Sequence, residues 1–430
     1  VTPSASGSAY EGVDDVIEDD FFVPTYYKGA FGSANWLEGW SYLDEAGLLF
    51  EQDEDVTLLG GNLTEDTYLA ASGTYYLNQQ LFVKDGVTLT IEAGTEILGR
   101  YDANYSADNP APCLVVEQGG KIIAQGTAEA PITFRSELDA TDPNYGNGRG
   151  LWGGLIINGY APIANDGGTA NVEGLTGVPY GGTDPDDNSG ILRYVRVWNG
   201  GSSIAPDNEI NGITLAGVGN GTTVDHCEVA YNLDDGFEMF GGTVDLRYCM
   251  VYKVGDDAFD TDTGYQGTGQ FLVVVRGPNS NRGHEMDGRN SGQAADDSFP
   301  KFSNVTIVGN NSGSSEDESL RLREGTAGHF QNYMLVDQQR RGFRATNEDG
   351  NLDGTFVVNG STPPSDDADG RYIWLDPLNV MDDVPTPATV AATDGTDPGA
   401  NFTFNIQDGN TGVTESNLVP STEFTGSTPT

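Results

Sequence analysis

Basic residues are scarce in this sequence. Its 430 residues include 20 Lys and Arg against 65 Asp and Glu, which gives a formal net charge of −45. Because phosphate backbones are bound by basic surfaces, this charge excludes nucleic acid as a partner. So many acids repel one another in a compact state, and salt or divalent cations relieve that stress. We therefore expect a secreted or cell-surface protein in a calcium-containing setting.

Cysteine, histidine and long apolar runs are also rare. Three cysteines are too few for a disulfide framework. Three scattered histidines leave no zinc cluster and disfavour a Ser-His-Asp triad. No apolar run reaches the roughly 18 residues that span a membrane, so no membrane span is predicted.

Glycine and short alternating apolar runs are abundant instead. Gly accounts for 59 residues, and charged residues for only 20%. Segments such as Val87–Ile97 and Leu155–Ile163 alternate apolar and polar side chains, which indicates strands rather than helices.

A seven-residue pattern recurs through the middle of the chain, mostly at steps of 22 to 25 residues. A second pattern, with apolar residues two apart, repeats in step with the first. Two strand columns at this period predict an all-β, right-handed parallel β-helix. The first column consists of Ile210–Ala216, Asp234–Phe240, Asp256–Asp262, Asn281–Asp287, Asp317–Arg323 and Arg340–Thr346. The second consists of Leu192–Trp198, Val224–Ala230, Leu246–Tyr252, Ser303–Gly309 and Gln331–Asp337.

Strand periodicity assigns a face to each residue of the first column. Phe237, Phe259, His284, Leu320 and Phe343 are predicted to point inward. One outward row is then Thr214, Glu238, Asp260, Glu285, Arg321 and Arg344, and the other is Ala216, Phe240, Asp262, Asp287, Arg323 and Thr346.

The same reasoning divides the chain into three parts. Residues 1–55 fit no coil and are predicted to cap or dock on one end of the solenoid, because such an end exposes strand edges. Residues 56–360 are assigned to the β-helix. Residues 361–430, rich in Pro, Thr, Ser, Asp and Gly, are expected to be irregular.

The outward acids form a ladder, since neighbouring coils stack about 4.8 Å apart. Oxygen-only ligands at this spacing suit Ca²⁺. We therefore predict a calcium site made by Asp260, Asp262, Glu285, Asp287 and Glu238. Two alternatives remain open: Arg321 and Arg323 of the following coil neutralise the acids, or the ladder is a solvated acidic face.

Four short motifs resemble those of the polygalacturonases, in the same order: NLD at 232–234, GDD at 255–257, GHE at 283–285 and RLR at 321–323. The resemblance implies a hydrolase in which paired aspartates act as acid and base. It makes Asp234, Asp256 and Asp257 catalytic, with His284 and Arg321 beside them. Two departures count against it: Glu285 follows the Gly-His pair, and Arg323 replaces the final Lys. A calcium-dependent uronate lyase, with Arg321 or Arg323 as base, is a related possibility.

A wider set of motifs resembles a family of secreted, pectin-lyase-like β-helix surface proteins common in Bacteroidota. The set includes DDGFEMFGGTVD, GDDAFDTDTGYQGTGQFLVVV, FSNVTIVG, GTAEAPITFRS, WGGLIINGYAPI and YKGAFGSANWLEGW. This resemblance implies a surface-exposed or secreted protein. Because a rigid solenoid has broad flat faces, we predict a non-enzymatic structural, adhesive or assembly role for it. Polysaccharide, other surface proteins or further copies of the chain are the partners expected on this view; a polysaccharide-active enzyme is the alternative.

Cys227 and Cys249 occupy the same place in successive repeats, so their Cα atoms are expected within disulfide range. Their positions point inward, beside Val229 and Val251. We expect two buried thiols there, and a buried thiol also at Cys113.

Overall fold

The structure is a computed structural model. It describes residues 56–336, except 107–108, 173–174, 176, 206–207, 289–297, 310–317 and 325, and strands only beyond Val336. The chain forms two compact units, Val1–Val56 and Thr57–Thr430. The fold below is that of the second unit, and the predicted cap at 1–55 lies outside the described residues.

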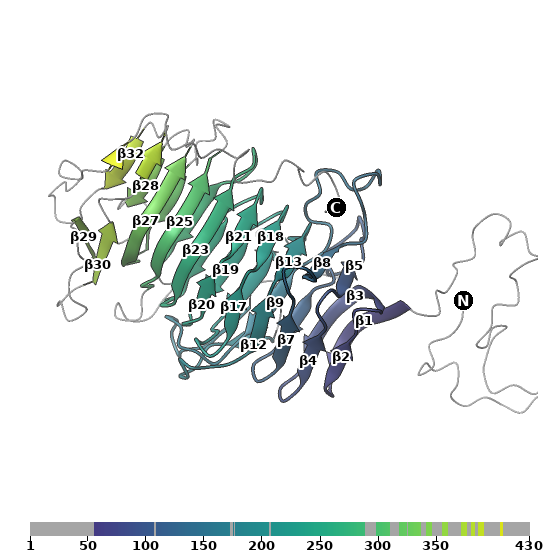
Figure 1. The fold of residues 1–430 in the computed structure, drawn as a ribbon. Coiled ribbons are helices and arrows are strands. Elements are labelled where there is room, and N and C mark those ends of the chain that lie inside the picture. The colour runs from purple at the N-terminus through teal and green to yellow at the C-terminus, as the bar shows by residue number, and fades with distance from the viewer. Residues whose placement is uncertain are drawn as a thin grey trace, which may run out of the picture. The chain divides into compact units, whose positions relative to one another are not determined.

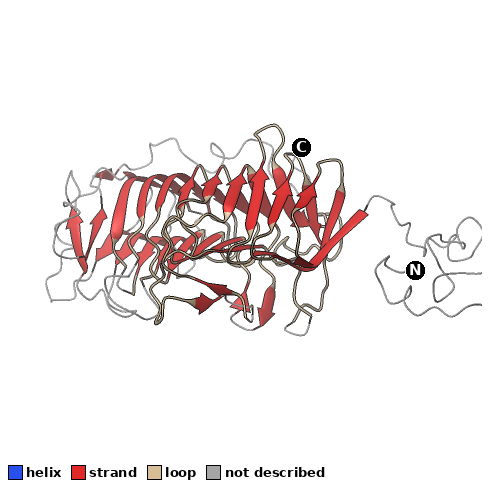
Figure 2. Cartoon of the chain, turned by 90° about the horizontal axis from the view of Figure 1, so that it is seen from below, coloured by secondary structure: helices blue, strands red, loops and turns tan. Residues whose placement is uncertain are grey.

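Three parallel sheets make up the coils (Figures 1 and 2). No helix is found among the described residues. The first sheet contains β2 (Thr67–Leu69), β4 (Thr88–Ile91), β7 (Lys121–Gln125), β12 (Gly190–Arg193), β17 (Thr223–Asp225), β20 (Asp245–Arg247), the first halves of β23 (Thr268–Val275), β25 (Lys301–Val308) and β27 (Gly328–Val336), and β30 (Arg371–Leu375). The second contains the start of β3 (Thr74–Val83), β5 (Glu96–Gly99), β8 (Ile132–Ser136), β13 (Val195–Trp198), β18 (Glu228–Ala230), β21 (Met250–Tyr252), the second halves of β23, β25 and β27, β31 (Val380–Asp382) and β33 (Asn405–Ile406).

The third sheet carries the candidate site. It contains the end of β3, then β6 (Leu114–Val116), β9 (Leu155–Asn158), β16 (Ile213–Ala216), β19 (Phe237–Phe240), β22 (Phe259–Asp262), β24 (Arg282–Met286), β26 (Glu318–Leu322), β28 (Arg341–Ala345) and β32 (Thr386–Val390). Outside the three sheets, β1 (Val56–Leu63) pairs with β3, and β29 (Thr355–Asn359) pairs with β30. The two small antiparallel pairs are β10 (Ala170–Asn171) with β11 (Pro179–Tyr180) and β14 (Ser203–Ala205) with β15 (Asn208–Glu209).

The predicted right-handed parallel β-helix is confirmed, but each coil has three strands where the sequence suggested two. The second predicted column is split by one residue of left-handed backbone per coil, such as Tyr194, His226 and Tyr248 (φ 48°, 53° and 55°). That residue turns the chain from the first sheet into the second. It explains why the inward residues on either side, Leu192 and Val195, are three apart rather than two.

The interior is a stack of like side chains. The predicted register of the third sheet is confirmed, with Phe237 opposite Phe259 and Phe259 opposite His284. The two phenyl rings stack with centroids 5.1 Å apart. Burying each such side chain stabilises the fold by roughly 1.5–3 kcal/mol, so every coil contributes to one continuous core.

A second core lies outside the coils. The segment 159–189, an insertion between β9 and β12 that contains β10 and β11, folds over the outer face of the third sheet. Outward residues such as Ile156, Ala216 and Phe240 pack there against Ile163 and Tyr180 of the insertion. The outward residues of β19 are therefore buried as well as its inward ones, and the alternative of a solvated face does not apply at this point.

Strands continue into the segment expected to be irregular. β30, β31, β32 and β33 all lie within residues 361–430 and pair in parallel with strands of the solenoid or with each other. Regular structure thus extends beyond the predicted limit at residue 360. Across the described residues, no helix has the length and apolar character needed to cross a membrane.

Candidate acidic site on the third sheet

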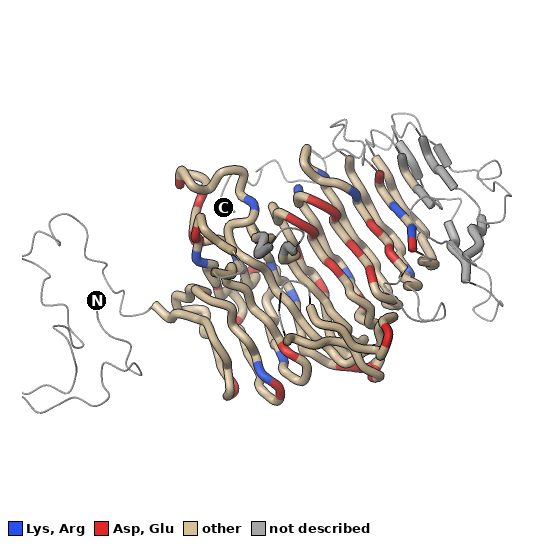
Figure 3. Tube along the Cα trace, turned by 180° about the vertical axis from the view of Figure 1, so that it is seen from behind, with Lys and Arg blue, Asp and Glu red and all other residues tan. Residues whose placement is uncertain are grey.

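The outward acids follow the predicted rows. Glu238 lies opposite Asp260, Asp260 opposite Glu285, and Glu285 opposite Arg321. Acidic positions (red) and basic positions (blue) accordingly lie close together on neighbouring coils (Figure 3). Glu238 and Glu285 are only 8% and 7% exposed. Charges this deeply buried are costly unless they are paired, protonated or bound to a cation.

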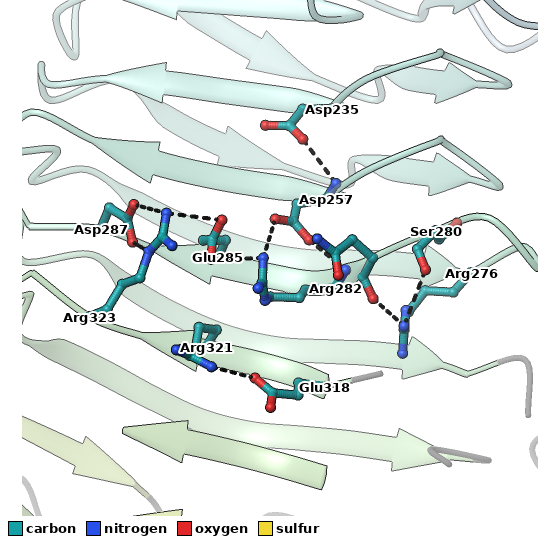
Figure 4. Close-up of polar contacts among 11 residues, drawn as sticks. Asp235, Asp257, Arg276, Ser280, Arg282, Glu285, Asp287, Glu318, Arg321 and Arg323 are labelled. Atoms are coloured by element: carbon teal, nitrogen blue, oxygen red, sulfur yellow. Dashed lines mark hydrogen bonds and ion pairs between the residues drawn. The ribbon is translucent and has the colours of Figure 1, made fainter. Parts of the chain in front are cut away.

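Arg323 neutralises one corner of the ladder (Figure 4). Its guanidinium donates two hydrogen bonds to Asp287, with Nε–Oδ1 at 2.5 Å and Nη2–Oδ2 at 2.6 Å. Nη2 also lies 3.3 Å from Glu285 Oε2. The hydrogen bonds to Asp287 and the field of these acids outweigh burial and raise the pKa of Arg323 above its usual value.

Arg282 neutralises a second corner. Its Nη1 atom lies 2.8 Å from Glu285 Oε1 and 3.2 Å from Asp257 Oδ2. Its backbone N–H donates to Asp257 Oδ1 at 2.5 Å. One coil further on, Arg321 donates to Glu318 at 3.2 Å. Arginines therefore neutralise Glu285 and Asp287, as one of the two alternatives held. Arg282, which takes part, was not among the arginines named from the sequence.

Asp260 lies outside these arginine pairs. Its Oδ1 atom is buried, and no group among the described residues forms a hydrogen bond to it. Carboxylate oxygens of Asp235, Glu238 and Asp260 all lie within 4.8 Å of one another, and so do those of Asp257, Asp260 and Glu285. Burial first, and then the neighbouring acids, raise the pKa values of Asp260 and Asp235 well above their usual range.

The chemistry of this donor set is that of a hard cation. Carboxylate oxygens with flexible spacing are what Ca²⁺ accepts, whereas zinc and copper sites use nitrogen or sulfur ligands. Of the predicted calcium ligands, the structure brings Asp260, Glu238 and Glu285 into these close groups. It adds Asp235 and Asp257, which were not predicted as ligands, and places Asp262 and Asp287 in the lining of a cavity.

That cavity, of about 460 Å³, lies between the third sheet and the insertion 159–189. Its sheet side is lined by Glu238, Phe240, Asp260, Asp262, Thr263, Asp287 and Arg323, and its insertion side by Asn165, Ala170, Asn171 and Tyr180. Burial raises the pKa of Asp262 to about 6. The cavity thus combines several acids, one paired arginine and an aromatic wall.

Comparison with protein-family models shows the family to which this chain belongs. A model described as a pectate-lyase-like β-helix domain matches residues 61–366. The chain belongs to this family. No curated protein and no solved structure is significantly similar to it.

Within this pectate-lyase-like domain, the aspartates aligned with the polygalacturonase motifs lie in the turns before β19 and β22. Asp257 is 2% exposed and held by Arg282. Asp234 and Asp256 instead approach Asp235 in the turns before β19 and β22. Arg321 is 3% exposed and bonded to Glu318. None of these four lines the cavity described above.

The remaining sequence candidates lie in the core of the domain. His284 is fully buried, and its ring packs edge-on against Phe259, Phe302 and Tyr333. Burial lowers its pKa to about 3, so it is neutral near pH 7. Cys227 and Cys249 are buried free thiols in successive coils, as expected, and Cys113 is a third.

Two parts of the site escaped the sequence reasoning. Asp235 and Asp257 precede their strands, so strand alternation gave them no face. The insertion that builds the far wall has no periodicity, and residues 159–189 fit no coil. A run of glycines and the ANDGG and TDPDD stretches mark it as a long loop.

Proposed function

We propose that this chain is a non-enzymatic, extracellular or cell-surface β-helix protein with a structural, adhesive or assembly role. In this proposal a Ca²⁺ ion is bound by Asp235, Glu238 and Asp260 and stabilises the third sheet. Two observations carry it: no group among the described residues forms a hydrogen bond to the buried Oδ1 atom of Asp260, and carboxylate oxygens of Asp235 and Glu238 lie within 4.8 Å of one of Asp260.

The physical argument is one of charge. Carboxylates this close cannot all be ionised at neutral pH unless a positive charge lies among them. Arginines supply that charge to Glu285, Asp287 and Asp257. No arginine within the described residues forms an ion pair with Asp260, so a bound cation is what completes the ladder there.

The setting and partners follow from the same charge. A net charge of −45 suits a medium with ample divalent cations. A rigid stack of coils offers long flat faces to a polysaccharide, to other surface proteins or to further copies of the chain. These partners are part of the proposal.

Calcium titration of the purified protein by calorimetry tests the site. Wild type is expected to bind Ca²⁺, and Asp260→Asn to lose most of the affinity. Asp186→Asn is the matched control, because Asp186 is exposed and outside the acid groups. Equal binding by wild type and Asp260→Asn would refute the site.

One observation favours the alternative of a polysaccharide-active enzyme. Asp262 lines an open cavity and has a pKa raised to about 6, as a general acid requires. If the chain were a hydrolase of this kind, it would release reducing ends from a polysaccharide, and Asp262→Asn would abolish that release. A wild-type protein inactive on neutral and uronate polysaccharides would remove this alternative.

A further inference from the structure

Thr263 has a backbone conformation that is unfavourable for its side chain. Its φ of 49° is left-handed, a region that β-branched residues rarely adopt. The residues stacked on it in the two preceding coils are both glycines, Gly217 (φ 59°) and Gly241 (φ 64°). The bend after the third sheet is thus one that glycine adopts without strain. In the coil that contains β22, the residue at this bend is a threonine.

Thr263 is 1% exposed and lines the cavity, yet no group among the described residues forms a hydrogen bond with its Oγ1 atom. The hydrogen bonds of Thr263 within that part of the chain are made by its backbone: the N–H donates to Asp262, and the carbonyl accepts from Ala164 of the insertion. A buried hydroxyl without a partner costs free energy unless a ligand or water completes it.

The other residues that line the cavity indicate which kind of ligand would pair with the Thr263 hydroxyl. Tyr180 and Phe240 meet at the cavity with ring centroids 6.0 Å apart, and they offer apolar surface to the carbon skeleton of a ligand. Asp262 offers a hydrogen-bond acceptor, and Asn171 offers an amide. A volume of about 460 Å³ is within the usual range for small-molecule sites.

We propose that this cavity binds a neutral, hydroxyl-rich sugar unit, with Thr263 Oγ1 as one of its hydrogen-bonding groups and Tyr180 and Phe240 against its carbon ring. Sugar hydroxyls donate to carboxylates and amides, and also pair with a threonine hydroxyl. Even with Ca²⁺ on Glu238 and Asp260, the lining keeps a negative charge, because Arg323 is already bound to Asp287 and leaves Asp262 unbalanced. This charge repels a uronate. The ligand class is thus neutral sugars rather than acidic ones.

This inference rests on the proposed function only for its biological setting, an adhesive surface that contacts polysaccharide. Its test is a glycan array of neutral and uronate oligosaccharides, probed with the whole protein in saturating Ca²⁺ and repeated in EGTA. Neutral glycans are expected to bind and uronates not. Binding to uronates alone, or to no glycan, would overturn the proposal.

Variants then assign the binding to the cavity. Thr263→Gly keeps the bend that Gly217 and Gly241 already adopt, so it should fold with an unchanged or higher melting temperature. It should bind the best neutral glycan about tenfold more weakly, the value of one hydrogen bond. Tyr180→Ala should weaken binding at least as much. Unchanged affinity in both variants would refute the cavity as the site.

The matched control is Lys253→Gly, at another residue with left-handed backbone (φ 51°) outside the cavity. It should leave glycan affinity unchanged, and a loss equal to that of Thr263→Gly would contradict the assignment. Failure of the calcium site is distinguishable, because Asp260→Asn would then bind Ca²⁺ like wild type whatever the glycan result.

Discussion

The guanidinium of Arg323 donates to both carboxylate oxygens of Asp287 from the next coil, at 2.5 and 2.6 Å. The pair is partly buried, with side-chain exposures of 29% for Arg323 and 9% for Asp287. This contact makes one arginine responsible for a large part of the charge balance on the third sheet.

Replacing Arg323 by Gln should therefore destabilise the protein strongly. The change leaves Asp287 buried without its partner and takes one of two arginines from Glu285, at a cost of about 3 kcal/mol in the free energy of unfolding. Denaturant unfolding measures this. The control is Arg100→Gln, whose ion pair with Glu137 is more exposed (45% and 20%) and should cost less than about 1 kcal/mol. Equal effects of the two changes would contradict the account.

His284 should make the fold sensitive to acid. Its pKa is about 3 in the folded protein and near 6.5 when unfolded. Below pH 6.5 the unfolded chain therefore binds a proton that the folded chain does not, and stability falls by about 1.4 kcal/mol per pH unit until about pH 3.

His284→Phe removes this term, since a phenyl ring matches Phe259 in the preceding coil. The stability difference between the variant and wild type, followed by denaturant unfolding from pH 7 to pH 4, should grow as the pH falls. Other groups titrate in both proteins and cancel from the difference. A constant difference across this range would show that His284 is not a buried neutral residue.

Tyr248 lies within an aromatic stack at the bend between the first and second sheets. Its ring centroid is 4.6 Å from that of His226 and 4.8 Å from that of Phe271, both in neighbouring coils. Tyr248→Asn keeps a residue that tolerates left-handed backbone, as Asn304 does in the same bend (φ 57°). It loses two ring contacts, so thermal unfolding should show a loss of about 1–2 kcal/mol. Tyr248→Phe retains the rings and should behave like wild type; a similar loss in that control would argue against stacking.

The register of the third sheet could be predicted residue by residue, because stacked coils place like side chains over one another. Phe237, Phe259 and His284 showed that register through their spacing alone. The split into three sheets was missed because the residue that turns the chain, such as Tyr194, is aromatic and not glycine. The available signal was that the inward residues Leu192 and Val195 are three positions apart in place of two.

The environment of the acids could not be predicted in the same way. Strand alternation says that Asp260 points outward, but not that residues 159–189 fold over that face. Arg282 begins β24, but its partner Asp257 lies in the turn before β22, where no periodic rule applies. Repeats thus predicted the scaffold, whereas the site depends on an insertion and on turns that do not repeat.

The central claim is that a cation completes the acid group around Asp260, and thermal unfolding in Ca²⁺ against EGTA at neutral pH tests it most directly. Wild type should melt at a higher temperature in Ca²⁺, with a gain of about 2.7 kcal/mol at a hundredfold excess over the dissociation constant. Asp260→Asn should lose this gain and, in EGTA, melt above wild type, because one buried carboxylate is gone. A wild-type melting temperature that is the same in Ca²⁺ and in EGTA would contradict the account.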